Sequence, residues 1–303
     1  MFAGPAVIPP GRATVHVSVM SASSPNDDII RFWNEIAAAK FVRFRTAMTT
    51  SLAAHGRFAL ELFPPPPGAA VLDVGCGFGD AAVELADRVG TSGRVLGIDC
   101  CREFVEIARR EFAAPPRIRF AVGDAETEGF DRRFDYVFSR FGTMFFASPV
   151  RALRNIRRGT RPGGRLAMVV WRSLDENPWA YGPKQIALRH LPPEAPPVAS
   201  CGPGPFSMAS PDLVNELLTA AGWSEIEVHA CDAPFELGTL DDAVELSMTL
   251  GPAGEIVREA GARAAGKRDA IVDELRQFFA DRLVGGRVVA GSASFTIAAS
   301  NRG

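Results

Sequence analysis

A glycine-rich string behind an acidic residue carries the clearest chemistry in this 303-residue sequence. It spans Val71–Asp80 and has the sequence V-L-D-V-G-C-G-F-G-D. Gly75, Gly77 and Gly79 lack Cβ atoms, so the backbone there can turn sharply and approach a ligand closely. The spacing is G-x-G-x-G, whereas a dinucleotide-binding fingerprint needs G-x-G-x-x-G. Asp73 precedes the first glycine by two residues, and its charge would repel a phosphate but suits a positively charged group on a ligand.

Two further carboxylates follow later apolar runs. Asp99 lies in G-I-D-C, where an acidic side chain can accept hydrogen bonds from both hydroxyls of a ribose. Asp124 lies in G-D-A-E, where it can accept one from the exocyclic amine of adenine. The sequence thus supplies a turn for the main-chain end of a ligand, a carboxylate for ribose and a carboxylate for a base. Without a phosphate binder, this set matches the outline of S-adenosylmethionine.

Short apolar runs that alternate with helical stretches must position these residues. We expect strands at 70–75, 94–99, 117–122, 134–139, 164–171, 225–230 and 287–299, with helices at 79–89, 102–113, 146–158 and 211–222. Such alternation is typical of right-handed βαβ units, which build a parallel sheet with both faces covered. Ligands of these sheets bind beyond the carboxyl ends of the strands, where all three carboxylates fall.

The N-terminal part of the chain divides into two segments. Residues 1–28 contain several prolines and a serine-rich stretch, without the basic start and apolar core of a signal peptide. We expect a disordered leader there, and Met20 stays an alternative start. From Ile29 onward apolar residues recur at three- and four-residue steps, which predicts a helical cap over 29–67 that ends in four consecutive prolines.

Two segments interrupt the sheet pattern after its fifth and sixth strands. The proline-rich segment 172–210 predicts an irregular covering stretch, and the segment 235–285 predicts helices at 241–250, 252–264 and 267–284. We expect both to be lid-like insertions, with padding of one flank or a dimer contact as the alternative. The ligand-binding domain is then a single unit over 68–303.

Composition argues against several kinds of partner. The chain has 33 basic and 35 acidic residues, whereas nucleic acids and anionic membranes demand a strongly positive partner. Its five cysteines, at 76, 100, 101, 201 and 231, form no C-x-x-C pair, so we expect no metal site and a reduced, cytoplasmic chain. No apolar run approaches the ~18 residues that a membrane span needs.

The motifs together resemble a known family. The glycine string, G-I-D and G-D-A-E, with F-D-Y-V-F-S-R-F-G-T-M-F-F at 134–146 and R-P-G-G-R-L-A at 161–167, resemble class I S-adenosylmethionine-dependent methyltransferases of the bacterial ubiquinone and menaquinone biosynthesis type. The resemblance covers about residues 29–235. It implies an α/β fold with a doubly wound, mostly parallel, seven-stranded Rossmann-like sheet. It also implies S-adenosylmethionine as the cofactor and S-adenosylhomocysteine as the product.

The resemblance also assigns cofactor-binding residues. Asp73 and the glycine turn hold the methionine end, Asp99 takes the ribose, and Asp124 with the backbone of Ala125 contacts the adenine edge. Cys100 lies against the adenine, where family members usually have an aliphatic residue. The full expected set is Asp73, Gly75, Cys76, Gly77, Gly79, Asp99, Cys100, Asp124, Ala125, Ser139 and Arg140.

Methyl transfer is an in-line displacement that needs alignment and exclusion of water more than acid–base groups. We expect Arg140 and His190 as catalytic candidates and a substrate wall of Phe141, Met144, Trp171 and Trp179, which favours a small, moderately hydrophobic acceptor. The largest cavity should lie beside residues 73–79 and 140–144. The other histidines, His55 and His229 among them, fit ordinary core or surface positions, and Trp33 or Phe41 is a candidate to close over the cofactor.

Other functions stay open from the sequence. A non-catalytic protein of this fold could bind the cofactor or a partner chain. A nicotinamide-dependent oxidoreductase is disfavoured by the glycine spacing, and an RNA methyltransferase by the net charge of −2. The sequence determines neither the acceptor nor the atom methylated, and it leaves a homodimer open.

Overall fold

A computed structural model describes residues 26–112, 117–130, 133–193 and 202–303. The expected leader therefore lies outside the described residues except for 26–28, as do the alternative start at Met20 and Cys201. In the described part of the chain, none of the helices has both the length and the apolar character needed to cross a membrane.

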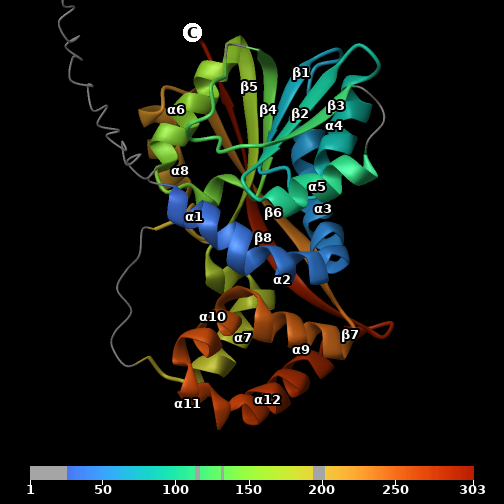
Figure 1. Cartoon of the computed structure of the whole chain (residues 1–303), viewed down its shortest axis with the longest axis vertical. Coiled ribbons are helices and arrows are strands. Elements are labelled where there is room, and N and C mark those ends of the chain that lie inside the picture. Colours follow the sequence, from blue (N-terminus) through green and yellow to red (C-terminus); the bar gives the residue numbers. More distant parts are fainter. Residues whose placement is uncertain (1–25, 113–116, 131–132, 194–201) are drawn as a thin grey trace, which may run out of the picture.

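One twisted sheet organises the chain (Figure 1). Its strands are β1 (Ala70–Val74), β2 (Arg94–Asp99), β3 (Ile118–Val122), β4 (Phe134–Arg140), β5 (Thr160–Trp171), β6 (Ser224–Gly238), β7 (Leu283–Val284) and β8 (Arg287–Ser300). The order is β3-β2-β1-β4-β5-β8-β6, with β7 paired to β8. Strands β1 to β5 pair in parallel, whereas β8 runs antiparallel to β5 and β6. The expected doubly wound, mostly parallel sheet is confirmed, with eight strands in place of seven because the two-residue β7 forms a hairpin with β8.

Helices cover both faces of this sheet. In Figure 1, α3 (Arg45–Leu62), α4 (Asp80–Val89) and α5 (Arg102–Glu111) lie on one side, and α6 (Pro149–Gly159) and α8 (Pro211–Ala220) lie on the other. Strand β1 is buried along its whole length, as a central parallel strand should be. Its carboxyl end therefore opens onto one edge of the sheet, where the glycine string begins.

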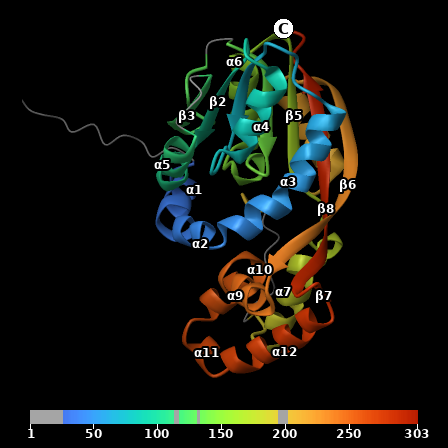
Figure 2. The same ribbon diagram turned by 90° about the vertical axis from the view of Figure 1, so that its right-hand side faces the viewer.

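Helices also lie across the carboxyl ends of the strands. The chain enters through α1 (Asp27–Arg31), a π-helical turn at Phe32–Ala37 and α2 (Ala38–Arg43), which pass below β1 to β4 in Figure 1. Further away, α7 (Pro178–His190), α9 (Leu240–Thr249), α10 (Gly251–Ala260), α11 (Ala262–Ala265) and α12 (Arg268–Ala280) form a separate helical group, seen at the bottom of Figure 2. Strands β6 and β8 extend toward this group.

The segments after β5 and β6 correct three expectations. The stretch 172–210, expected to be irregular, contains α7, because Pro178 occupies the first helical turn and a buried face with Ile186 and Ala187 stabilises the helix despite Pro183. Strand β6 extends eight residues beyond the expected end at 230, so the helices after it begin at Leu240. The helix expected over 267–284 ends at Ala280, and β7 follows it.

Candidate functional site

The glycine turn after β1 adopts the backbone conformation that its residues were expected to allow. Gly75, Gly77 and Gly79 have φ angles of 70°, 54° and 89°, all in the left-handed region. A Cβ on Gly75 would lie 2.9 Å from the Cα atom of Gly142, so this position requires glycine. A Cβ on Gly77 would meet nothing within 4 Å. The turn is thus packed against the Gly142 backbone at Gly75 and borders open space at Gly77.

Asp73 lies in β1 directly before this turn, and its environment is unusual. The residue is 1% exposed, and neither carboxylate oxygen has a hydrogen-bond partner in the described part of the chain. Burial raises the pKa of Asp73 to about 7, while the charge of Arg140 opposes this rise. Among the described residues, Asp73 is therefore a buried carboxyl group without a hydrogen-bond partner.

Asp99, at the end of β2, supports the turn from the neighbouring strand. Its Oδ2 accepts a hydrogen bond from the Gly77 amide at 2.9 Å, and its Oδ1 accepts one from the Cys101 amide at 2.8 Å. Burial raises the pKa of Asp99, and these two backbone donors oppose that rise. Each oxygen retains a lone pair for a further donor such as a hydroxyl group.

Asp124, after β3, is contacted by an N-terminal residue that the sequence did not single out. Its Oδ1 accepts hydrogen bonds from Asn26 Nδ2 at 3.0 Å and from the Glu126 amide at 2.9 Å. Asn26 Oδ1 in turn accepts one from the Ala147 amide at 3.2 Å. Ala125 lies beside this contact, buried at 6% exposure. The third expected carboxylate thus lies at the same sheet edge as the first two, with the start of α1 against it.

A second asparagine fixes the π-helical turn to the end of β2. Asn34 Nδ2 donates to the Cys100 carbonyl at 2.9 Å, and Asn34 Oδ1 accepts from the Arg102 amide at 3.0 Å. The neighbouring Trp33 ring packs against Phe104 and Phe145, with centroids 6.1 and 5.0 Å away. The N-terminal helices are therefore tied to the carboxyl end of β2, and closure of Trp33 over a cofactor stays a prediction.

The cysteines at this edge are held in their thiol form. Cys76 is 3% exposed, and burial raises its pKa well above the ordinary value. Burial and the charge of Asp99 also raise the pKa of Cys100. Both side chains thus behave as small apolar groups in the wall of the site.

The end of β4 supplies Ser139 and Arg140. The Ser139 hydroxyl donates to the Val74 carbonyl at 2.8 Å and ties β4 to β1 below the glycine turn. The Arg140 side chain is 10% exposed and forms an ion pair with Asp80, the first residue of α4. Both residues lie at the end of β4, the strand that pairs with β1 and its Asp73. The described ion pair of Arg140 is with Asp80 and not with Asp73.

The four expected substrate-wall residues come together in one aromatic cluster. Phe141 has a φ of 60°, which is rare for a bulky residue, and its ring stacks on Trp171 with centroids 4.0 Å apart. Trp171 contacts Trp179 at 5.5 Å, and its amide donates to the Met144 sulfur at 3.3 Å. Trp179 stacks on Phe235 of β6 at 4.5 Å. Phe235 belongs to this cluster although the sequence analysis did not name it.

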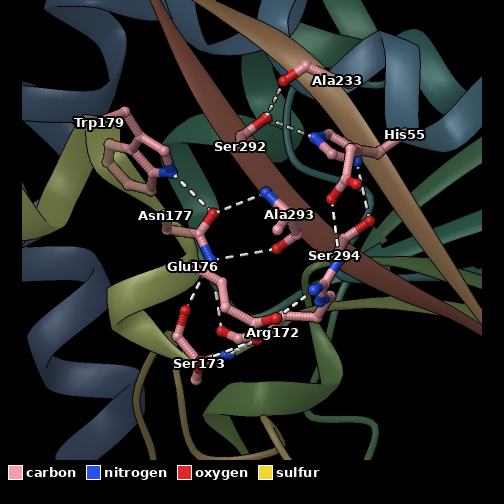
Figure 3. Close-up of polar contacts among 11 residues, drawn as sticks. His55, Arg172, Ser173, Glu176, Asn177, Trp179, Ala233, Ser292, Ala293 and Ser294 are labelled. Atoms are coloured by element: carbon pink, nitrogen blue, oxygen red, sulfur yellow. Dashed lines mark hydrogen bonds and ion pairs between the residues drawn. The ribbon is translucent and has the colours of Figure 1, made fainter.

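His55, which the sequence left as an isolated core residue, borders the same cluster from α3. Its ring lies edge-on to Phe141 and Trp171, with centroids 5.7 and 5.3 Å away. Two serines of β8 hold it, with Nε2 2.8 Å from Ser292 Oγ and Nδ1 2.8 Å from Ser294 Oγ (Figure 3). Burial lowers the pKa of His55 to about 4, so the ring is neutral near pH 7.

The hydrogen bonds of Ser292 define the protonation of this ring. Ser292 Oγ donates to the Ala233 carbonyl at 2.8 Å, so it accepts from His55 Nε2, which must carry the hydrogen. Nδ1 of the neutral ring then accepts from the Ser294 hydroxyl. With both nitrogens occupied, His55 positions the aromatic cluster and is poorly placed to take a proton from an acceptor.

Asn177 connects α7 to the same strand, as Figure 3 shows. The residue is fully buried, and its Oδ1 accepts from the Ala293 amide at 2.9 Å and from the Trp179 indole at 3.1 Å. Its Nδ2 donates to the Ala293 carbonyl at 3.1 Å. This one amide therefore fixes both the start of α7 and the indole of Trp179. No local sequence pattern marks Asn177, Asn26 or His55, because each has a hydrogen-bond partner more than 90 residues away.

His190 lies apart from these contacts. It ends α7, and its Nε2 is 3.2 Å from Glu274 Oε1 of α12. Among the described residues, this contact places it within the helical group and not against the aromatic cluster. The geometry therefore gives no support to His190 as a catalytic residue.

Two cavities in the described part of the chain lie away from the glycine turn, so the expected cavity beside that turn stays a prediction. One, about 590 Å³, is an open groove lined by residues such as Pro178, Asp232, Pro234 and Gly291. The other lies inside the helical group, between Trp179 and Pro252. Aromatic side chains pack closely near the strand ends: Phe141 stacks on Trp171, and Trp33 packs against Phe104 and Phe145.

The chain is similar in sequence to known methyltransferases. A sequence profile of a methyltransferase domain matches residues 71–164, which hold the glycine turn and all three carboxylates. Nocamycin O-methyltransferase of Saccharothrix syringae is 31% identical over 239 residues, which are 69% of this chain and 84% of that protein. This chain is a member of the methyltransferase family.

Other relatives cover this methyltransferase less completely. Demethylmenaquinone methyltransferase of Bacillus licheniformis is 31% identical over 128 residues, 42% of this chain and 53% of that protein. The chain spans only 36% of an uncharacterised 37.1 kDa protein of a Streptomyces fradiae transposon that it matches at 37% identity over 40% of its own length. The match to demethylmenaquinone methyltransferase confirms the resemblance to the menaquinone biosynthesis type.

Solved structures confirm the fold of this methyltransferase. A putative methyltransferase of Bacillus halodurans superposes with a TM-score of 0.53 at 18% identity, covering 82% of this chain and 99% of that one. Phosphoethanolamine N-methyltransferase 2 of Haemonchus contortus, in complex with S-adenosyl-L-methionine, superposes with a TM-score of 0.51 at 17% identity, covering 92% and 60%. At these identities the likeness concerns the fold alone.

Proposed function

We propose that this methyltransferase binds S-adenosylmethionine at the carboxyl ends of β1, β2 and β3 and transfers its methyl group to a small, moderately hydrophobic organic acceptor. The observation that carries the proposal is the Asp73 carboxyl group, 1% exposed and without a hydrogen-bond partner in the described part of the chain, beside the open space at Gly77. A buried carboxylate of this kind needs a positively charged partner. An α-amino group of a ligand in the space beside Gly77 would supply one.

The other residues at this edge fit the rest of such a ligand. Asp99 retains lone pairs for the two hydroxyls of a ribose, while its contact with the Gly77 amide keeps the turn in shape. The thiol of Cys100 offers a small apolar surface for a base. Asp124 and the backbone of Ala125 lie where an exocyclic amine would need an acceptor. Asn26 already donates to Asp124, so that contact must be exchanged or shared when the base binds.

The aromatic cluster suits the acceptor side. A bound sulfonium supplies an activated methyl group, so the residues around it need to align the acceptor and exclude water. Phe141 and Trp171 present π-faces that favour a nearby positive charge and pack against an apolar acceptor. His55 and Asn177 hold these rings from α3, β8 and α7. No general base is assigned, because the described histidine of the cluster has both nitrogens engaged.

The names of the relatives support a small acceptor. They include methyltransferases of nocamycin, of aklanonic acid from a Streptomyces species and of demethylmenaquinone. Each is named for a small molecule, and the aklanonic acid enzyme is 37% identical over 115 residues, 52% of its length. The helical group after β5 and β6 adds α7, whose Trp179 belongs to the aromatic cluster. We therefore place acceptor selection at the junction of this group with the strand ends.

Isothermal titration calorimetry with S-adenosylhomocysteine tests the cofactor site. The wild-type protein should bind it with micromolar affinity, and Asp99→Ala should weaken binding by at least about tenfold, because a ribose would lose its charged acceptor. Asp87→Asn is the matched control, since Asp87 is exposed on α4 and pairs with Arg117 away from the turn. If wild-type protein does not bind, or if Asp99→Ala binds as tightly as wild type, the cofactor assignment is wrong. Transfer of a labelled methyl group to a panel of phenols, acids and quinols then tests catalysis.

A further inference from the structure

One guanidinium group lies among three carboxyl groups at the end of β1. The positive charge of Arg140 lowers the pKa of Asp73, and the charges of Asp80 and Asp99 raise it. The guanidinium pairs with Asp80, and Asp73 is left without a partner among the described residues. The site therefore has more negative than positive charge, and its deepest carboxyl group is the one that the internal cation does not satisfy.

The position of Arg140 is restricted, but its hydrogen-bonding capacity is not exhausted. A Cβ on Gly56 of α3 would lie 3.0 Å from Arg140 Cδ, so the aliphatic part of the side chain runs directly against that helix. Within the described ranges, the one hydrogen bond of the guanidinium runs from Nη2 to Asp80 Oδ2. A guanidinium group has five N–H donors in a planar fork, so it can hold a second carboxylate or exchange the first.

The two partners of the ion pair differ in how easily they can separate. The Arg140 side chain is 10% exposed, whereas that of Asp80 is 31% exposed at the start of α4. If the pair opens, Asp80 can turn toward water at small cost, while Arg140 stays buried and needs a new anion. Release of Asp80 to water, with a new anion on Arg140, therefore costs less free energy than exposing Arg140.

We propose that Arg140 exchanges Asp80 for the carboxylate of the ligand's amino-acid end, so that Asp80 is an internal competitor for the carboxylate subsite. The inference rests on the proposed function, because S-adenosylmethionine and S-adenosylhomocysteine carry both an ammonium and a carboxylate on one carbon. The ammonium satisfies Asp73, and the carboxylate takes the place of Asp80 on the guanidinium. A ligand that lacks the ammonium leaves Asp73 without a partner, and a ligand that lacks the carboxylate leaves Arg140 paired with Asp80, so only a zwitterionic ligand end engages both residues.

Three ligands separate the two charges experimentally. S-adenosylhomocysteine carries the ammonium and the carboxylate, its decarboxylated aminopropyl analogue carries the ammonium alone, and 5′-methylthioadenosine carries neither. Calorimetry would measure their dissociation constants with wild-type protein and with Asp80→Asn, Arg140→Gln, the double variant, and the control Asp87→Asn on the same helix. Thermal unfolding of each variant checks that it is folded.

The exchange predicts effects of opposite sign. Asp80→Asn removes the competitor and should tighten S-adenosylhomocysteine by roughly fivefold, the value of one exposed ion pair, without tightening the aminopropyl analogue. Arg140→Gln should weaken S-adenosylhomocysteine by at least about tenfold, while the aminopropyl analogue binds as well or better because a repelling cation is gone. Methylthioadenosine should bind equally to all forms, and the control should bind every ligand as wild type does.

The double variant covers the case in which Arg140→Gln alone fails to fold, because it leaves neither member of the pair with an unmatched charge. It should bind S-adenosylhomocysteine at least about tenfold more weakly than wild type does. The exchange is overturned if Arg140→Gln or the double variant lowers the affinity for the first two ligands by the same factor, or if Asp80→Asn does not tighten S-adenosylhomocysteine. If wild-type protein binds none of the three ligands, the proposed function fails and the exchange fails with it.

Discussion

Replacing Asp73 by asparagine should make the unliganded protein more stable at alkaline pH while abolishing cofactor binding. Asparagine has nearly the same shape as aspartate but carries no charge. The Asp73 side chain is buried, with no hydrogen-bond partner in the part of the chain that the structure describes. The native fold therefore holds this group more easily when it is neutral, and ionisation destabilises the fold.

The size of the effect follows from the pKa of Asp73. Burial raises this pKa from the ordinary 3.8 to about 7. Below about pH 4 the group is protonated in both the folded and unfolded chains, so ionisation makes no contribution. As the pH rises toward about 7 the unfolded chain ionises first, and the fold loses stability up to a limit of about 4 kcal/mol. Above pH 7 the loss is complete and constant.

Urea denaturation of wild type and Asp73→Asn would be compared near pH 5 and near pH 8.5. Asparagine brings its own buried amide, which costs about 1–3 kcal/mol at every pH and cancels when the two pH values are compared. The free energy of unfolding of Asp73→Asn, relative to wild type, should therefore rise by about 3 kcal/mol from the lower to the higher pH. Exposed Asp87, replaced by asparagine, should show no such dependence.

Calorimetry on the same samples would show whether this destabilising carboxylate serves a ligand. S-adenosylhomocysteine should bind wild type and should not bind Asp73→Asn measurably, because its ammonium group loses its counter-charge. If the stability difference between the two proteins is the same at both pH values, the carboxyl group of Asp73 is not held in a raised-pKa environment. The reasoning from its burial would then be refuted.

Four further changes test other parts of the site. Gly77→Ala should lower the free energy of unfolding by only about 1–2 kcal/mol, the cost of left-handed strain, because the added Cβ meets no protein atom. It should still prevent binding of S-adenosylhomocysteine, because the Cβ enters the space that we propose for the ligand. Calorimetry that showed wild-type affinity would contradict this. Gly75→Ala, by contrast, should destabilise the protein by several times that amount, since its Cβ would lie 2.9 Å from the Gly142 backbone. His55→Gln should lose less stability than wild type when the pH is lowered. The pKa of His55 in the folded chain, about 4, lies below the ordinary 6.5, so wild type loses stability as the pH falls below 6.5, by about 2 kcal/mol near pH 5. Equal losses in both proteins on acidification would argue against a neutral His55. Asn177→Ala should cost about 2–4 kcal/mol in urea denaturation and shift tryptophan fluorescence to longer wavelength, because Ala293 and the Trp179 indole lose their partner; a loss below about 1 kcal/mol would show that the amide is dispensable.

The sheet and the glycine turn could be predicted because their signals are local. Apolar runs mark the buried strands, and the glycines at 75, 77 and 79 mark positions where φ is positive. The three carboxylates follow because the carboxyl ends of parallel strands meet at one edge of a sheet. The length of β6 and the presence of α7 could not be predicted in this way. Proline in the sequence of α7 signals a break, and packing of its buried face overrides that signal.

The contacts that close the site depend on residues distant in sequence. Asn26 reaches Asp124 across 98 positions, and His55 reaches the serines of β8 across 237 and 239. Nothing in the local pattern around these residues specifies a partner, since asparagine before a helix and histidine within one both have ordinary roles. The aromatic contacts of Phe141, Trp171 and Trp179 could not be predicted for the same reason. They depend on how rings from separate elements pack, which spacing within one element does not determine.

The contrast between local sequence signals and contacts of distant residues bears on which residues determine the acceptor specificity of the methyltransferase. The cofactor half of the site is built from backbone turns and carboxylates within 71–124, a short stretch that the methyltransferase profile also matches. The acceptor half that we propose combines Phe141 after β4, Trp171 of β5, Trp179 of α7, Phe235 of β6 and His55 of α3. If an acceptor binds against these rings, the ring that moves most easily should decide its size and shape. The Trp179 indole donates to one side chain, Asn177, and its ring stacks on Phe235. Phe141 and Trp171 contact each other and the His55 ring, which two serines hold. Exchange of residues in α7 should therefore change the acceptor range more readily than exchange of residues in the sheet.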